Sequence, residues 1–255
     1  MSALSLSVII PAFNEESRLP PYLSSIIGYL EQRGGGWEVI VVDDGSRDAT
    51  QAVVRAVMAT CPSVRLIPLG ENHGKGAAVR AGMLAATGAL RLFCDADGAT
   101  PIVELQRLER ALSAGADIAI GSRAIRGRDT RVEGTLHRKV IGTAYNWLVR
   151  LIVVPGVHDT QCGFKLFRGD VAERVFAAQR LSGFGFDVET LFLARKCGYV
   201  LREVPVNWRD RPGGKVRLLR DSIRMFLDLV KLRRSWAAGV YRVPTEGLRR
   251  AAGAP

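Results

Sequence analysis

The sequence predicts an α/β domain built on a mixed, mainly parallel β-sheet flanked by helices. Five short apolar runs, rich in β-branched residues, alternate with amphipathic stretches of helical length. The runs occupy residues 6–11, 37–46, 64–69, 90–94 and 117–122, and they end in polar or turn residues. Runs of this kind are typical of parallel strands that are buried on both faces. With 47% hydrophobic residues, the chain has enough apolar side chains for a packed core.

Polar side chains follow the ends of all five predicted strands. Because the carboxyl ends of parallel strands meet at one edge of a sheet, we expect these side chains to form a single site. They are Asn14, Glu15, Asp43, Asp44, Asn72, Asp95, Asp97, Ser122 and Arg123.

The C-terminal part of the chain predicts an amphipathic helix over residues 216–232, docked on the domain through its apolar side. That side comprises Val216, Leu219, Ile223, Phe226, Leu227 and Val230. We expect a main domain over residues 1–215, this helix within 216–244, and a flexible tail over 245–255. The helix ends in basic and aromatic residues, which makes it a candidate for peripheral contact with a membrane.

Cysteine and histidine usage indicates neither a zinc site nor a disulfide framework. The four cysteines are widely spaced without a Cys-x-x-Cys pair, and the three histidines are scattered. The N-terminus lacks a signal-peptide pattern, and no stretch of about 18 apolar residues appears. We therefore expect a cytoplasmic protein that does not span a membrane.

The formal net charge of +11 predicts an anionic partner, such as nucleic acid, an acidic membrane surface or a phosphorylated substrate. Basic residues concentrate in two segments that follow the predicted sheet. Residues 202–234 contain ten basic and four acidic side chains, and residues 123–139 contain six and two. Neither segment interleaves basic residues with exposed aromatics or shows a DNA-reading helix, which argues against nucleic acid.

Asp95-Ala96-Asp97 places two carboxylates one residue apart, directly after a predicted strand. Oxygen ligands of this kind suit Mg²⁺ or Mn²⁺, and such an ion can neutralise charge on a departing diphosphate. A solvated turn is the alternative explanation for an acidic pair at a strand end.

Residues 72–78 form a glycine-rich segment with one lysine, Lys75, before a predicted helix. It is not a P-loop, because Gly70 leaves only three residues before Gly74-Lys75 and because Gly76 stands where Ser or Thr would bind magnesium. The first strand also lacks the glycine cluster of a dinucleotide-binding fold. The segment could nevertheless offer backbone N–H groups and a positive charge to a diphosphate.

Six motifs in order resemble the inverting family 2 glycosyltransferases of GT-A fold, and most closely the dolichyl-phosphate glucosyltransferase and polyprenyl-phosphate glycosyltransferase branch. The likeness covers about residues 5–215. The motifs are residues 9–15, 42–46, 72–78, 95–100, 121–123 and 159–165.

The resemblance implies that Asp97 and Asp95 hold the metal, with Asp97 also serving catalysis, and that Lys75 approaches the diphosphate. The remaining donor residues would surround the nucleotide-sugar. They are Pro11, Ala12, Asn14, Glu15, Asp43, Asp44 and Ala96. Gly45 and Ser46 have a purely architectural alternative, because Asp-Gly-Ser followed by Asp48 also makes a turn and a helix N-cap.

On the acceptor side, the resemblance points to Gln161, Phe184, Asp187 and Glu189. A sugar acceptor would need a base such as Asp187, although that residue could equally cap a helix. A phosphate acceptor is already anionic and instead needs cations, for which the basic segments offer candidates. These are Arg123, Arg138, Arg211 and Lys215.

The resemblance implies a metal-dependent transfer of a hexose to a polyprenyl or dolichyl phosphate. Ala99 replaces the metal-binding Gln of the mannosyl branch, which favours UDP-glucose over GDP-mannose as donor. The missing transmembrane anchor leaves several explanations open. One is that the C-terminal helix attaches the enzyme peripherally at the inner membrane face, and another is that a membrane-protein partner recruits it. The third is that the acceptor is a soluble sugar. A homodimer is a further candidate assembly. A non-catalytic anion-binding protein on the same fold is the alternative from a different functional class.

Overall fold

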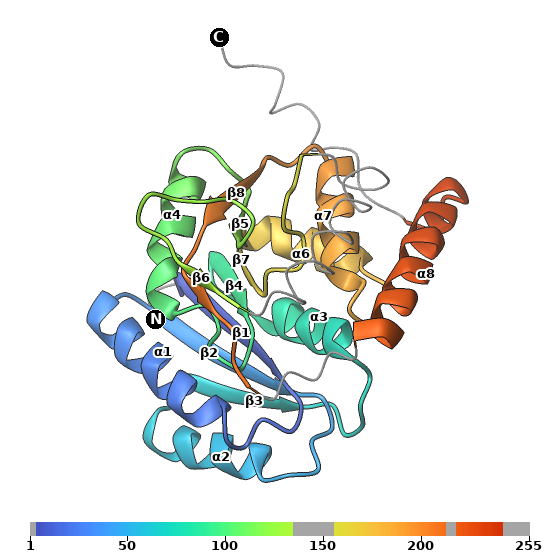
Figure 1. Ribbon diagram of the computed structural model, residues 1–255. Coiled ribbons are helices and arrows are strands. Elements are labelled where there is room, and N and C mark those ends of the chain that lie inside the picture. The colour runs from blue at the N-terminus through green and yellow to red at the C-terminus, as the bar shows by residue number, and fades with distance from the viewer. Residues whose placement is uncertain (1–3, 135–155, 213–217, 242–255) are drawn as a thin grey trace.

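The computed structural model describes residues 4–134, 156–212 and 218–241, with the side chains of residues 218–223 excepted. Its centre is a seven-stranded sheet in the order β3-β2-β1-β4-β7-β5-β8. The predicted α/β fold with a mainly parallel sheet is confirmed (Figure 1).

The five predicted strands form with bounds close to those expected. They are β1 (Leu6–Ala12), β2 (Trp37–Asp43), β3 (Val64–Pro68), β4 (Leu90–Cys94) and β5 (Ile118–Ser122). Two further strands of the sheet, β7 (Phe164–Arg168) and β8 (Leu201–Pro205), were not predicted, and β7 runs antiparallel between β4 and β5. A small parallel pair joins β6 (Val132–Glu133) to β9 (Trp208–Arg209).

Helices cover both faces of the sheet (Figure 1). One face carries α1 (Leu19–Arg33), α2 (Thr50–Thr60) and α4 (Leu105–Ser113), which follows the short η1 (Ile102–Glu104). The other face carries α3 (Lys75–Ala85), α6 (Gly169–Ala178) and α7 (Phe186–Lys196). Alternate residues of β1 supply the two cores, because successive side chains of a strand point to opposite faces. Ile9 packs on the α3 side, whereas Val8 and Ile10 pack on the α1 side.

The final described helix, α8 (Leu218–Ala237), lies outside α7 and contributes to the same core (Figure 1). Its buried residues are Met225, Leu229 and Leu232. The predicted docking face was therefore wrong, because Phe226, Leu227 and Val230 are exposed. The other predicted members of that face, Val216, Leu219 and Ile223, lie outside the described side chains, as does the predicted tail over 245–255. No described helix is both long and apolar enough to cross a bilayer.

Candidate active site

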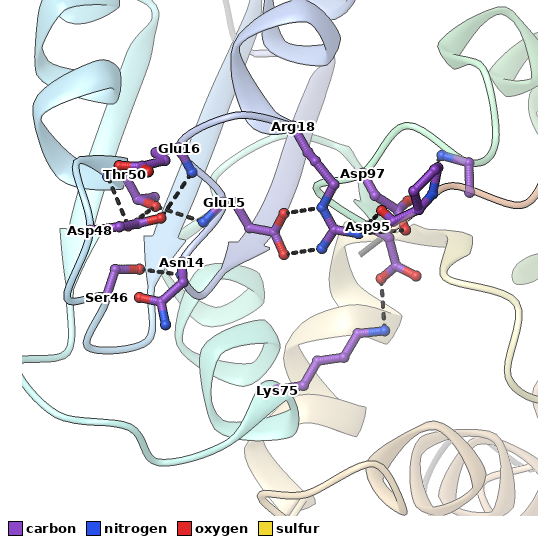
Figure 2. Close-up of polar contacts among 12 residues, drawn as sticks. Asn14, Glu15, Glu16, Arg18, Ser46, Asp48, Thr50, Lys75, Asp95 and Asp97 are labelled. Atoms are coloured by element: carbon purple, nitrogen blue, oxygen red, sulfur yellow. Dashed lines mark hydrogen bonds and ion pairs between the residues drawn. The ribbon is translucent and has the colours of Figure 1, made fainter. Parts of the chain in front are cut away.

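The carboxyl ends of the parallel strands bring the predicted residues to one edge of the sheet, as expected. The loop after β1 is held against the loop after β2 by backbone-to-side-chain hydrogen bonds (Figure 2). Asn14 N–H donates to Ser46 Oγ at 2.8 Å, and Glu15 N–H donates to Thr50 Oγ1 at 2.7 Å. Asn14 has a φ of 51°, and its Oδ1 accepts from Arg47 N–H. The structure thus uses Asn14 and Ser46 to build these loops.

Asp43, at the end of β2, is fully buried and has one carboxylate oxygen without a partner. Its Oδ2 accepts from Gln51 Nε2 at 2.7 Å and from Ser46 N–H at 3.2 Å. Its Oδ1 has no hydrogen-bond donor among the described residues. A buried acceptor without a donor is costly, so this oxygen is a candidate contact for a hydroxyl or N–H group of a ligand.

Asp44 anchors the segment before α3, and its predicted contact with the nucleotide stays a prediction. Its Oδ1 accepts from His73 N–H at 2.8 Å, and its Oδ2 accepts from Gly74 N–H at 2.9 Å. Both carboxylate oxygens therefore bind backbone groups of the protein.

At the start of α3, backbone N–H groups of Gly76 and Ala77 bind within the protein, and the predicted contact of this segment with a diphosphate stays a prediction. The carbonyl oxygen of Ser182 accepts from Gly76 N–H at 2.7 Å and from Ala77 N–H at 3.3 Å. A Cβ at Gly76 would lie 2.6 Å from the Leu181 carbonyl oxygen, which explains why a glycine stands there. The side chain of Lys75 adds a positive charge at this helix start.

Lys75 faces the acidic pair. Its Nζ lies 2.7 Å from Asp95 Oδ1 (Figure 2). The same ammonium group lies over the rings of Phe93 and Phe186. Burial alone would lower the pKa of Lys75, but the carboxylates of Asp95 and Asp187 raise it above its usual value. The ammonium group is therefore charged at neutral pH.

Arg18, which was not predicted, occupies the other side of the acidic pair. Its guanidinium pairs with Glu15 through two hydrogen bonds, Nε to Oε2 at 2.7 Å and Nη2 to Oε1 at 2.5 Å (Figure 2). Its Nη1 lies 3.9 Å from Asp97 Oδ2. Both oxygens of the Glu15 carboxylate bind Arg18, and the predicted role of Glu15 at the nucleotide stays a prediction.

Asp95 and Asp97 supply oxygen ligands of the kind that Mg²⁺ and Mn²⁺ prefer. Asp97 Oδ1 accepts from Ala99 N–H at 3.0 Å, and burial together with Asp95 raises the pKa of Asp97. Among the described residues, no group of three His, Cys, Asp or Glu side chains could hold a metal. Magnesium commonly binds one or two carboxylates and takes its remaining ligands from water and substrate phosphates. The pair thus fits a divalent ion that binds together with a diphosphate.

Pro11 and Ala12 end β1, and Ala96 follows the end of β4. All three are buried, and Ala12 and Ala96 belong to the core on the α1 face. The carbonyl oxygen of Ala12 accepts from Asp44 N–H at 2.8 Å. Their predicted contact with the nucleotide stays a prediction.

Arg123, at the end of β5, is clamped by a buried carboxylate that the sequence analysis did not single out. Its Nε and Nη2 donate to the two oxygens of Asp159 at 2.7 and 2.8 Å, and its guanidinium lies over the ring of Trp208. Burial alone would lower the pKa of Arg123, but Asp159 raises it. The guanidinium is thereby fixed in orientation, with about a third of the side chain exposed.

The other predicted acceptor residues are only partly described. Gln161 Nε2 donates to Met225 Sδ at 3.4 Å, which ties it to α8. Arg211 is exposed, whereas Arg138 and Lys215 lie outside the described residues.

Asp187, the predicted base, is buried at the start of α7 and forms an ion pair with Lys165. Lys165 is itself 1% exposed, and its Nζ also donates to the carbonyl oxygen of Cys162 at 2.7 Å. Burial raises the pKa of Asp187 although Lys165 opposes this. To serve as a base, Asp187 would have to leave this partner.

Glu189 supports the loop before α7. It accepts from the backbone N–H groups of Arg180 and Leu181 and from Tyr241 Oη. Phe184, in the same loop, packs against the core. The structure thus gives Glu189 an architectural role next to the start of α3.

Gly163 is a further site residue that sequence reasoning quoted without assigning a role. Its carbonyl oxygen accepts from Asp95 N–H at 3.0 Å, and a Cβ at this position would lie 2.0 Å from Asp95 Oδ2. The signal was present, since Gly163 and Lys165 belong to a quoted motif. Arg18 had a signal too, three residues after Glu15 at a helix start.

Comparison with known proteins shows which family the chain matches and which proteins are similar to it. Residues 7–176 match the model of the family described as glycosyl transferase family 2. The dolichyl-phosphate beta-glucosyltransferase of Drosophila melanogaster is 40% identical over 94% of this chain and 78% of its own length. The Homo sapiens protein of the same name is 36% identical over 93% of the chain and 78% of its own length.

Solved structures show the same fold. Glucosyl-3-phosphoglycerate synthase from Mycobacterium tuberculosis, in complex with Mn²⁺, UDP and glucosyl-3-phosphoglycerate, aligns with a TM-score of 0.66 and 19% identity. The alignment covers 90% of this chain and 80% of the synthase. Mannosyl-3-phosphoglycerate synthase from Rubrobacter xylanophilus aligns with a TM-score of 0.65 and 21% identity, over 92% of this chain and 75% of its own.

Proposed function

The chain belongs to glycosyl transferase family 2 and is a glycosyltransferase, and from this premise we propose that it transfers glucose from UDP-glucose to a polyprenyl or dolichyl phosphate. The observation that carries the proposal is the similarity to dolichyl-phosphate beta-glucosyltransferases over more than nine-tenths of the chain. The arrangement of the site supports it in four respects.

The donor side has the groups that a nucleoside diphosphate requires. The Oδ1 of Asp43, which has no donor among the described residues, can accept a hydroxyl or N–H group of the nucleoside. It lies at the carboxyl end of β2, on the edge of the sheet where open α/β folds bind ligands. Lys75 supplies a charged ammonium group for the diphosphate. The glucose and the uridine of the donor follow from the similarity to the relatives and neighbours rather than from a contact in this structure.

We propose that Mg²⁺ or Mn²⁺ is held by Asp95 and Asp97. When bound, such an ion neutralises the charge that develops on the departing diphosphate. Lys75 stabilises the same charge from the α3 side. The reaction forms a bond between an acceptor oxygen and the anomeric carbon and breaks the bond from that carbon to the diphosphate, which leaves as UDP.

The state of Asp187 favours a phosphate acceptor. A sugar hydroxyl must lose a proton during attack, and the candidate base is buried in an ion pair with Lys165. A phosphate monoester is already anionic near neutral pH, so its oxygen can attack without a base. Arg123, held in orientation by Asp159, is a described cation that can position such a group.

The exposed face of α8 supports attachment to the surface of a membrane. Phe226, Leu227 and Val230 are exposed on a helix whose other side packs on the core, and Arg224 and Lys231 are exposed beside them. Apolar side chains flanked by basic ones are typical of interfacial helices. Because α8 also contacts Gln161, it would bring the acceptor side of the site near the lipid.

The experiment that tests the proposal is transfer of labelled sugar into the organic phase. UDP-glucose and GDP-mannose are supplied in parallel, with polyprenyl phosphate, Mn²⁺ and the Asp97→Ala variant as control. We expect a lipid product from UDP-glucose that is lost in the variant and in EDTA. A product from GDP-mannose alone would contradict the donor assignment, and metal-dependent UDP binding without any lipid product would contradict the acceptor assignment.

A further inference from the structure

Arg18 has a position that the donor and acceptor roles above do not use. It directly precedes α1, and its guanidinium lies between Glu15 and Asp97 (Figure 2). The side chain is 20% exposed. Its Nε and Nη2 are both bound to the Glu15 carboxylate, so the planar group cannot turn about its axis. This fixes Nη1 toward Asp97 Oδ2, with a further contact of 3.3 Å to the carbonyl oxygen of Pro212.

Each of the two predicted metal ligands therefore has its own cation. Lys75 lies against Asp95 from the α3 side, and Arg18 lies near Asp97 from the α1 side (Figure 2). Together with Glu15, these groups carry three negative and two positive charges, a net charge of −1. Without Arg18 the same cluster would carry a net charge of −2.

We propose that Arg18 is a positioning residue that keeps divalent metal from binding tightly to Asp95 and Asp97 until the donor diphosphate binds with it. A fixed cation close to a carboxylate lowers the affinity of that carboxylate for another cation, as it lowers proton affinity. The diphosphate brings the negative charge that compensates for Arg18 and Lys75. The inference rests on the proposed function, because it assumes a metal-bound diphosphate at this site.

The inference predicts how the affinity for Mn²⁺ alone, in the absence of nucleotide, depends on charge. An opposite charge at this range shifts an ionisation equilibrium by about one pKa unit or more, which corresponds to about tenfold in affinity. We therefore expect Arg18→Gln to bind Mn²⁺ alone about tenfold more tightly than the wild type. Arg18→Lys, which keeps the charge and loses the two-bonded geometry, should stay nearer the wild-type value.

Two further variants separate this effect from a general change in structure. Combining Glu15→Gln with Arg18→Gln returns the cluster to −1 and should restore an affinity near that of the wild type. Arg33→Gln is the matched control, because Arg33 pairs with Glu109 at 2.7 Å and is similarly exposed, but lies at the other end of α1. It should leave the affinity for Mn²⁺ unchanged.

The measurement is titration of the full-length protein with Mn²⁺ alone by electron paramagnetic resonance, followed by UDP in the presence of Mn²⁺. If the wild type binds no UDP with Mn²⁺, the proposed function is wrong. If it does, and Arg18→Gln binds Mn²⁺ alone no more tightly than Arg33→Gln, the role of Arg18 is wrong. If Arg18→Gln does not fold, the affinity of Glu15→Gln for Mn²⁺ alone tests the role of Arg18 instead. That variant leaves the cation unneutralised and should bind Mn²⁺ about tenfold more weakly than the wild type, and unchanged affinity would overturn the inference.

Discussion

Substituting Gly163 with alanine should disable the site while leaving the fold intact. The new Cβ would lie 2.0 Å from Asp95 Oδ2, 2.2 Å from Cγ and 2.5 Å from Oδ1. Ordinary van der Waals contact begins at 3.4 Å, so the nearest oxygen must move by about 1.4 Å. Gly163 does not have a positive φ, so the substitution adds no backbone strain. The overlap is relieved by moving the Asp95 carboxylate away from Lys75 and from the place where metal is expected.

A misplacement of about 1 Å at a reacting centre commonly costs about 100-fold in rate. We therefore expect Gly163→Ala to lose about two orders of magnitude in glucosyl transfer and to bind UDP with Mn²⁺ more weakly. The melting temperature should change by only a few degrees, since Asp95 is about one-third exposed and can move into solvent. Rates from the lipid-extraction assay, calorimetric titration and thermal unfolding measure the three quantities.

The matched control is Gly28→Ala. Gly28 lies within α1, where a Cβ would meet nothing within 4 Å, and alanine is the better helix former by about 1 kcal/mol. This variant should keep full activity and melt at an equal or higher temperature. Wild-type turnover and nucleotide affinity in Gly163→Ala would refute the placement of Asp95 on which the site depends.

Three further predictions concern stability and membrane contact. Lys165→Met leaves its buried carboxylate partner without a counter-charge and should lower the free energy of unfolding by about 3–5 kcal/mol, measured with urea; a change below 1 kcal/mol would contradict the buried ion pair. Burial alone would raise the pKa of Asp159, but Arg123 lowers it below its usual value. The pair therefore stabilises the fold fully above the unfolded pKa of about 3.9. This stabilisation is lost as the pH falls through the lower pKa of the folded state. The urea concentration at the midpoint of unfolding should therefore decrease as the pH is lowered below about 4. If the midpoint of Asp159→Asn depended on pH as steeply as that of the wild type, this assignment would be contradicted. Leu227→Asp, on the exposed face of α8, should weaken binding to vesicles containing anionic lipid, whereas Val103→Asp, on another exposed apolar residue, should not; equal effects would count against α8 as the contact surface.

The sheet, and the gathering of polar residues at its carboxyl edge, were predictable because burial on both faces leaves continuous apolar runs. β7 was not, since Lys165 interrupts its apolar pattern. That lysine is tolerated because Asp187 lies opposite it, and the sequence gives no measure of which carboxylate, 22 residues away, will be its partner.

The different roles of neighbouring polar residues could not be predicted from the sequence either. Asp43 and Asp44 are adjacent, yet Asp43 Oδ1 has no donor within the described part of the chain, whereas Asp44 anchors the backbone before α3. Asp43 is the last residue of β2 and Asp44 is the first residue of the following loop. The direction of each side chain therefore depends on the geometry of that loop. In α8, apolar residues occur on both sides of the helix, so periodicity alone could not tell which of Leu229 and Leu227 would be buried.

The most direct test of the central claim is to compare polyprenyl phosphate with the corresponding polyprenol as acceptors for labelled UDP-glucose. If the phosphate oxygen is the nucleophile, only polyprenyl phosphate should be glucosylated, and Asp187→Asn should retain more activity than Arg123→Ala. Transfer to polyprenol, or complete loss of transfer in a folded Asp187→Asn variant, would contradict a phosphate acceptor and restore Asp187 as the base.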